Sequence, residues 1–145
     1  MFYLDTSALL KLLWPEPESE AVLEHVTRED VVVVSELAEL ETEVQLRAAW
    51  LAGRYRKAAW RQLRTKLAEF RETEPFAFRP LPGSLFQTAL RQHHASGRAV
   101  CRTLDCLHLA AMEELDVNRL MTHDTTQAHA ARALGFNVLM PGRSD

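Results

Sequence analysis

The fold is decided by the first thirteen residues, Met1–Leu13, which have the sequence MFYLDTSALLKLL. A short apolar run ends at a single acid, Asp5, and is followed by leucines at helical spacing. This order predicts a buried strand over residues 1–5 and a helix over residues 6–14. The last residue of such a strand lies at the carboxyl edge of a sheet, where open α/β folds bind their ligands. Asp5 is therefore the first candidate for a functional side chain.

Strand-like and helical segments alternate along the rest of the chain. Strands are expected over 31–34, 119–122 and 136–140, and the proline-containing segment 73–82 is expected to be extended. Helices are expected over 17–26, 35–53, 55–71, 84–95, 103–115 and 125–134, with capping boxes beginning at Ser84 and Asp124. Strands separated by helices imply a parallel sheet covered on both faces. The sequence thus predicts an α/β fold, a three-layer α/β/α sandwich with four or five short parallel strands.

Length and composition favour one ordinary globular domain over residues 1–145. Apolar residues make up 47% of the chain and charged residues 26%, and no run of 18 apolar residues could span a membrane. The start of the sequence lacks the features of a signal peptide. Cys101 and Cys106 match neither a paired-cysteine zinc site nor a disulfide framework. We therefore expect reduced thiols in a cytoplasmic protein.

The net charge of −3 conceals a basic segment between Gln45 and Leu67. Affinity for a polyanion depends on local charge, so this segment could hold phosphates despite the acidic remainder. A solvated helix face is the alternative interpretation. The segment contains no acid and seven of the 17 basic residues: Arg47, Arg54, Arg56, Lys57, Arg61, Arg64 and Lys66.

Three aspartates occupy positions where an acid is unusual. Asp5 and Asp124 each follow a predicted strand and precede a helix, and helix capping alone could explain both. Asp105 is surrounded by leucines near the start of a helix, where aspartate is otherwise unfavourable. It could instead interact with the helix dipole. Arg102 could be its ion-pair partner or a phosphate contact.

Glu41 is the fourth acid of interest. The expected packed face of its helix consists of Leu37, Leu40, Val44, Ala48 and Leu51. Glu41 lies four residues after Leu37 and three before Val44, on that same side, and a charge there must be paired or bound to a metal. Glu36, Glu39 and Glu43 are expected on the solvent-facing side. Glu39 remains an alternative to Glu41, because it has a similar sequence context.

Together these acids predict a metal site. Two of them end parallel strands, and two project from helices that should pack beside those strands. Carboxylate oxygens suit Mg²⁺ or Mn²⁺, and without a cation such a cluster would repel itself. A metal held there can activate water and polarise a phosphodiester. Zinc catalysis through His108, His123 and His129 is a weaker alternative, because no two histidines have the spacing of a helical zinc pair.

With all four acids placed, the sequence closely resembles the PIN-domain nucleases, and within them the toxins of VapBC-type toxin–antitoxin pairs. The matching segments are YLDTSALLKL, VSELAELETEVQLRAA, RTLDCLHLAAMEEL and MTHDTTQAHAARALGFNVL. They occur in order and cover most of the chain, whereas residues 53–99 match only in being helical. The combination is specific, although each segment alone would be weak.

The resemblance implies a Mg²⁺- or Mn²⁺-dependent endoribonuclease with a PIN-like fold. It assigns the metal ligands to Asp5, Glu41, Asp105 and Asp124, and supporting hydroxyl groups to Thr6, Ser7 and Thr122. It further implies homodimerisation and inhibition by a cognate antitoxin protein. For the RNA substrate, we expect Arg47, Arg54 or Arg102 to bind flanking phosphates. The alternatives are a housekeeping PIN nuclease in RNA processing and a catalytically inert RNA-binding module. A phosphatase is disfavoured because Ser7 stands where its second acid would be needed.

Overall fold

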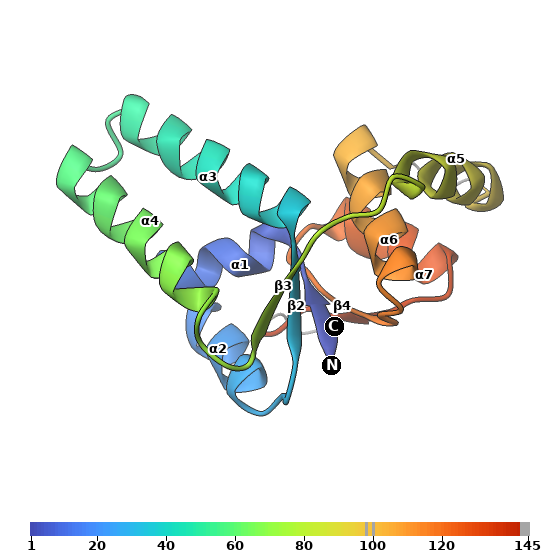
Figure 1. The fold of residues 1–145 in the computed structure, drawn as a ribbon, viewed down its shortest axis with the longest axis horizontal. Helices are drawn as coiled ribbons and strands as arrows, with labels where there is room; N and C mark the ends of the chain where they lie inside the picture. The colour runs from blue at the N-terminus through green and yellow to red at the C-terminus, as the bar shows by residue number, and fades with distance from the viewer. Residues whose placement is uncertain (98, 100, 143–145) are drawn as a thin grey trace.

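A computed structural model describes residues 1–97, 99 and 101–142 of the chain. These residues form a five-stranded parallel sheet with strand order β3-β2-β1-β4-β5 (Figure 1). The strands are β1 (Phe2–Leu4), β2 (Val32–Ser35), β3 (Phe76–Arg79), β4 (Arg119–Met121) and β5 (Asn137–Leu139). The helices are α1 (Thr6–Leu13), α2 (Ser19–Thr27), α3 (Glu36–Leu51), α4 (Lys57–Phe70), α5 (Leu85–Ala95), α6 (Thr103–Glu114) and α7 (Thr125–Ala133).

The central strand β1 is inaccessible to solvent on both faces. Phe2 and Leu4 pack into one apolar cluster with residues of α1–α4, whereas Tyr3 packs into a second cluster with residues of α5–α7. This alternation follows from the two-residue period of a strand. Figure 1 shows α1–α4 on one side of the sheet and α5–α7 on the other. The predicted three-layer α/β/α sandwich is confirmed, with five strands.

The strand order creates a switch point next to β1. The chain passes from β1 outward to β2 and β3, and then returns to place β4 on the other side of β1. Tyr3 pairs with Val33 of β2 and with Leu120 of β4, so the carboxyl ends of the three strands lie side by side. Asp5, Ser35 and Thr122 occupy these ends. In open parallel sheets this position is the usual ligand site.

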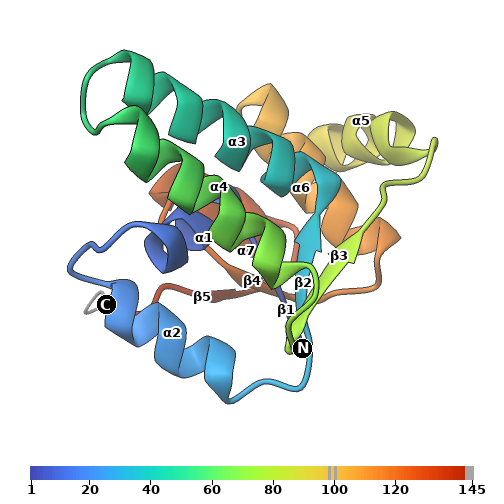
Figure 2. The same ribbon diagram turned by 60° about the vertical axis from the view of Figure 1, so that its left-hand side comes forward.

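Helices α3 and α4 form an antiparallel arm that projects from the sheet (Figures 1 and 2). The prediction for the packed face of α3 was wrong. Its buried residues are Ala38, Thr42 and Leu46, whereas Leu40 and Val44 are 62% and 58% exposed. Small side chains let α3 approach α1 and α4 closely, and hydrophobic size alone does not reveal such a contact.

Two of the glutamates expected to face solvent on α3 instead join the two helices of the arm. Glu43 pairs with Arg64 at 2.7 Å, and Glu39 pairs with Arg71. Part of the basic segment is thereby neutralised by acids outside it. Glu36 is exposed, as expected.

Three further expectations can be compared with the structure. The extended segment 73–82 contains an additional edge strand, β3, which pairs with β2. The capping box expected at Ser84 is absent, because the Ser84 hydroxyl donates to Glu114 rather than accepting from its own helix. Cys101 and Cys106 are free. Among the described residues no helix is long and apolar enough to cross a membrane.

Candidate active site

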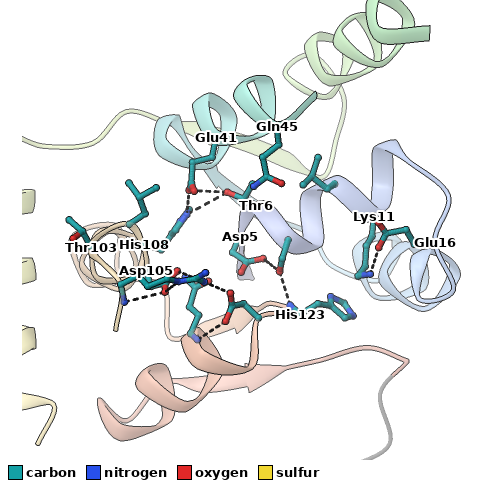
Figure 3. A pocket seen from close by; sticks show the side chains of 16 residues that line it. Asp5, Thr6, Lys11, Glu16, Glu41, Gln45, Thr103, Asp105, His108 and His123 are labelled. Carbon is teal, nitrogen blue, oxygen red and sulfur yellow. Dashed lines mark hydrogen bonds and ion pairs between the residues drawn. The ribbon is translucent and has the colours of Figure 1, made fainter. Parts of the chain in front are cut away.

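A cavity of about 580 Å³ lies at the carboxyl ends of β1 and β4 (Figure 3). It opens between α1, α3 and the N-terminal ends of α6 and α7. Its lining includes one acid from each of four segments that are remote in sequence: Asp5, Glu41, Asp105 and Asp124. The topology therefore brings all four of the predicted acids to one place.

Asp5 is the most deeply buried of the four acids, at 1% exposure. Its carboxylate accepts hydrogen bonds from the Ala8 backbone N–H at 2.9 Å, from the Ser7 hydroxyl at 2.8 Å and from the Thr122 hydroxyl. Burial nevertheless raises the pKa of Asp5, although these hydrogen bonds act in the opposite direction. Asp5 thus caps α1, as the simpler interpretation held, and also presents a carboxylate that would gain from a nearby cation.

Glu41 is held by two neighbours from other elements. Its Oε1 accepts a hydrogen bond from the Thr6 hydroxyl at 3.0 Å and contacts Nε2 of His108, as Figure 3 shows. Burial opposes ionisation of Glu41, but the contacts with His108 and Thr6 and the charge of Arg102 together lower the pKa of Glu41. The carboxylate is therefore ionised and oriented.

His108 connects Glu41 to the interior of the sheet. Its Nδ1 lies 2.8 Å from the Tyr3 hydroxyl, which also contacts the hydroxyl of Ser35. A donor chain from Ser35 to Tyr3, His108 and Glu41 satisfies every member when His108 carries its proton on Nε2. Residue His108 is 2% exposed, so its position is determined by packing as well as by hydrogen bonds.

Asp105 and Asp124 share a cation, the guanidinium group of Arg102. Its Nε donates to Asp105 at 2.8 Å, and its Nη2 contacts Asp124. Asp124 Oδ1 also caps α7 by accepting from the backbone N–H groups of Thr126 at 2.8 Å and Gln127 at 3.1 Å. Burial opposes ionisation of Asp124, but these bonds and Arg102 together lower its pKa. Both expected roles of Asp124 are thus compatible, since the second oxygen faces Arg102.

The donor set fits a hard divalent cation. All four acids carry carboxylate oxygens, the donor type that Mg²⁺ and Mn²⁺ prefer, and Arg102 already places positive charge between two of them. Within the described ranges no three His, Cys, Asp or Glu side chains stand in ligand geometry. Close coordination by three acids would therefore require side-chain rearrangement. The side chain of Arg102 is 66% exposed and has room to leave.

The predicted hydroxyl residues lie beside the acids they were expected to support. Thr6 donates to Glu41, while Ser7 and Thr122 donate to Asp5. Glu39 does not line the cavity, because it pairs with Arg71 on the arm. The structure thus favours Glu41 over Glu39.

The three arginines proposed for RNA binding have different locations. Arg102 lines the cavity that contains the four acids, which we call the catalytic cavity in the proposals below, and Arg54 lines a smaller cavity beside it. Arg47 lies instead in a surface hollow with Trp50 and Trp60.

Two residues of the cavity were not predicted as part of the acid site, and His108 was considered only in the weaker zinc alternative. His108 follows Asp105 by three residues, so it lies on the same face of α6, and this spacing was a usable signal. Lys11 is a buried lysine that pairs with Glu16 and, at 2.8 Å, with Glu18. Its burial depends on the turn after α1, which the sequence does not specify.

Comparison with known proteins identifies the family. The sequence model of the PIN domain matches residues 2–133. The chain belongs to the PIN domain family. This PIN domain is 33% identical over 141 residues to ribonuclease VapC46 of Mycobacterium tuberculosis, and the match covers 96% of each chain. The predicted resemblance is confirmed, and the VapC proteins are relatives of this PIN domain.

Solved structures share the fold of this PIN domain at low sequence identity. VapC20 of M. tuberculosis, described as a sarcin–ricin loop cleaving toxin, superposes with a TM-score of 0.72 at 17% identity, covering 97% of this chain and 100% of that one. FitAcB from Neisseria gonorrhoeae superposes with a TM-score of 0.71 at 18% sequence identity, and the match covers 97% of this chain and 98% of that one. VapBC2 from Rickettsia felis, bound to a promoter DNA fragment, superposes with a TM-score of 0.67 at 14% sequence identity. The match covers 96% of this chain and 98% of that one.

Proposed function

We propose that the chain is a single PIN-like nuclease domain that hydrolyses RNA phosphodiesters with Mg²⁺ or Mn²⁺, as the toxin of a toxin–antitoxin pair. The observation that carries this proposal is the convergence of four acids from remote segments on one cavity. The relative named ribonuclease VapC46, which matches over nearly the whole chain, supports RNA as the substrate.

Asp5, Asp105 and Asp124 would hold the metal, and Glu41 would complete its ligand shell or orient the attacking water. The bound metal would supply positive charge for the scissile phosphate and lower the pKa of water. Thr6, Ser7 and Thr122 keep the carboxylates in position through the hydrogen bonds described above. Preorganised groups of this kind reduce the cost of reorganisation during the reaction.

Arg102 has a second role in this proposal. A divalent cation held by Asp105 and Asp124 would compete with the Arg102 guanidinium, which would then be free at the mouth of the cavity. There it can bind a phosphate of the RNA, because guanidinium groups match phosphate oxygens in geometry and charge. Arg54, which lines the neighbouring cavity, is the second arginine that we propose to bind a phosphate of the RNA.

A cognate antitoxin and a second copy of the chain are the proposed protein partners, and the cytoplasm is the proposed location. Among the structural relatives is VapBC2, which is bound to promoter DNA. A homodimer is supported by exposed apolar side chains on two helices, which a monomer rarely leaves uncovered. These residues are Leu40 and Val44 of α3, and Phe86 and Leu90 of α5.

The proposal is tested by incubating total cellular RNA with purified wild type and Asp5→Asn, with and without Mg²⁺, and mapping the new RNA ends. We expect cleavage only by wild type with metal. Asparagine preserves the helix cap of α1, so the fold should survive. The matched control is Asp116→Asn, which changes an exposed acid at φ 55°, a conformation that asparagine tolerates.

Two results would contradict the proposal. Full cleavage by Asp5→Asn would remove Asp5 from the site. Metal-independent RNA binding without any cleavage would select the inert RNA-binding module instead. A reading frame for a small DNA-binding protein immediately upstream would favour the toxin over a housekeeping nuclease.

A further inference from the structure

We propose that the cavity between Trp14, Arg54 and Tyr55 is a subsite for one unpaired nucleotide of the RNA, adjacent to the scissile phosphate. The proposal rests on the nuclease function argued above and adds how the substrate is held beside the catalytic cavity. It also specifies that the bound segment is single-stranded. Its evidence is the continuity of two cavities, an aromatic pair with an exposed tryptophan, and an arginine that is free to bind a phosphate.

The subsite is a cavity of about 210 Å³ that adjoins the catalytic cavity. Leu10, Glu16 and Gln45 line both. Figure 3 shows Gln45 of α3 and Glu16 after α1 at the end of the catalytic cavity opposite Thr103 and Asp105. A chain whose phosphate lies among the acids can therefore continue past Gln45 into the smaller cavity without leaving the surface. The volume suits a single base rather than a folded element.

An aromatic pair forms the far wall of this cavity. Trp14 follows the last residue of α1 and is 39% exposed, and its ring centroid lies 5.1 Å from that of Tyr55 at an angle of 32°. The Tyr55 hydroxyl donates to the backbone carbonyl of Leu46, which holds the ring against α3. A fixed ring loses little entropy when a base stacks on its accessible partner. Base–aromatic stacking of this kind tolerates any sequence.

The lining offers one free guanidinium group to a nucleic acid backbone. Arg54 is exposed and has no ion-pair partner among the residues that the structure describes. Glu16 is the single acid of the described lining, and it is paired with Lys11, which also contacts Glu18. Arg54 is therefore the side chain of this cavity that can bind a phosphate. Such a contact weakens with added salt.

The substrate segment must be single-stranded because paired bases cannot reach these rings. In an A-form duplex each base is stacked on its neighbours and its faces are covered. A base can enter the cavity and stack on Trp14 only when it is unpaired. A loop, a bulge or a strand end satisfies this requirement.

The test measures RNA binding separately from cleavage. The probe is a 12-nucleotide unstructured RNA of mixed sequence with a 3′ fluorescein, and its anisotropy is followed with wild-type protein in EDTA. Loss of a stacking partner in Trp14→Ala should weaken binding at least about fivefold. Trp14→Phe retains an aromatic face and should bind within about twofold of wild type. Thermal unfolding of each variant verifies that it is folded.

The charge component has its own matched pair of variants. Arg54→Gln should reduce the slope of log affinity against log salt by roughly 0.7, the value for one phosphate contact with a single strand. Arg132→Gln removes the same charge from an exposed position on α7, outside both cavities and outside the basic segment, and its slope should remain that of wild type. A fully paired duplex version of the probe, which has no loop, bulge or overhanging end, should lose most of the Trp14-dependent affinity.

The outcomes separate the subsite from the nuclease proposal. If Trp14→Ala binds the RNA as tightly as wild type while wild type cleaves RNA, the subsite is disproved and the nuclease stands. The aromatic cavity would then be assigned to a protein partner. If wild type neither binds nor cleaves RNA, both proposals fail. Equal losses in Trp14→Ala and Trp14→Phe would also overturn the stacking role.

Discussion

His108 holds Glu41, one of the four acids of the cavity, in a fixed position. Its two ring nitrogens contact the Tyr3 hydroxyl and the Glu41 carboxylate, so it transmits the rigid position of β1 to the α3 arm. Groups that orient a metal ligand in this way are often as important as the ligand itself. We regard His108 as a positioning residue.

Replacement of His108 by alanine should therefore lower the cleavage rate by about 10–100-fold, because Glu41 loses its oriented partner. His108→Gln can still donate to Glu41 and should retain more activity. The exposed His129→Ala is the control and should behave as wild type. Cleavage of a defined RNA and Mn²⁺ affinity measured by calorimetry provide two independent readouts. Unchanged Mn²⁺ affinity and activity in His108→Ala would contradict the positioning role.

The position of Arg102 predicts that its guanidinium competes with the proposed metal for the carboxylates of Asp105 and Asp124. Its guanidinium neutralises Asp105 and Asp124 in the structure. Arg102→Gln should therefore lower the melting temperature without metal, because the two carboxylates lose their cation. The same change should enlarge the stabilisation by millimolar Mn²⁺, which grows as RT ln(1 + [L]/Kd). Arg28→Gln, which breaks an exposed pair with Glu24, is the control. Equal metal-induced shifts in both variants would disprove the competition.

At the scale of elements, α5 and α6 are joined by hydrogen bonds and an ion pair in addition to their apolar contact. Gln92, which is buried, donates to the Leu109 carbonyl at 3.2 Å and to Glu113 at 2.7 Å. Arg91 also pairs with Glu113. The hydrogen bonds from Arg91 and Gln92 lower the pKa of Glu113. The packing of the two helices therefore depends in part on an ionised carboxylate.

This connection predicts a defined pH dependence. The pKa of Glu113 is lower in the folded state than the unfolded value of about 4.3. Its contribution is therefore complete above about pH 4.3 and disappears as the pH falls through the folded pKa. Glu113→Gln should lower the free energy of unfolding by less than about 1 kcal/mol at pH 7, because the pair is largely exposed and screened. Urea unfolding of wild type and Glu113→Gln at pH 7 and pH 3 measures this contribution. If the two proteins differ in free energy of unfolding by the same amount at both pH values, the prediction is contradicted.

At the scale of the whole molecule, α3 and α5 leave apolar side chains without cover. Leu40 and Val44 of α3 and Phe86 and Leu90 of α5 are each more than half exposed. Both views show the two helices toward the top of the molecule, one on each side of the sheet (Figures 1 and 2). An isolated copy would expose this surface to water at a cost of roughly 25 cal/mol per Å². Association of two copies is the simplest way to remove it.

Charge introduced into this surface should separate the proposed dimer. The double variant Val44→Glu/Phe86→Glu should sediment as one chain of 16.5 kDa, whereas wild type should sediment at about twice that mass. Leu23→Glu places the same charge on an exposed leucine of α2 and should not alter the mass. A wild-type protein that remains monomeric at about 100 μM would contradict the proposal.

The sequence alone determined the layered fold and three of the four acids. A strand, an acid and a helix follow one another in Met1–Leu13. Such elements can be predicted because hydrophobic periodicity and helix capping depend on residues that are close together in the sequence. Asp5, Asp105 and Asp124 could be selected because each is an acid next to an apolar run. Glu41 was also selected, but from an incorrect face of α3, because small residues pack that helix.

Only the tertiary structure decided how these acids are held. The contact of His108 with Glu41 joins residues 67 positions apart, and Thr122 reaches Asp5 across 117 positions. The edge strand β3 likewise exists because β2 is available to pair with it. Hydrophobic periodicity shows which side chains of a helix or strand share a face, but not which other element that face contacts. The contacts depend on packing among segments that are remote in sequence, so only the tertiary structure determines them.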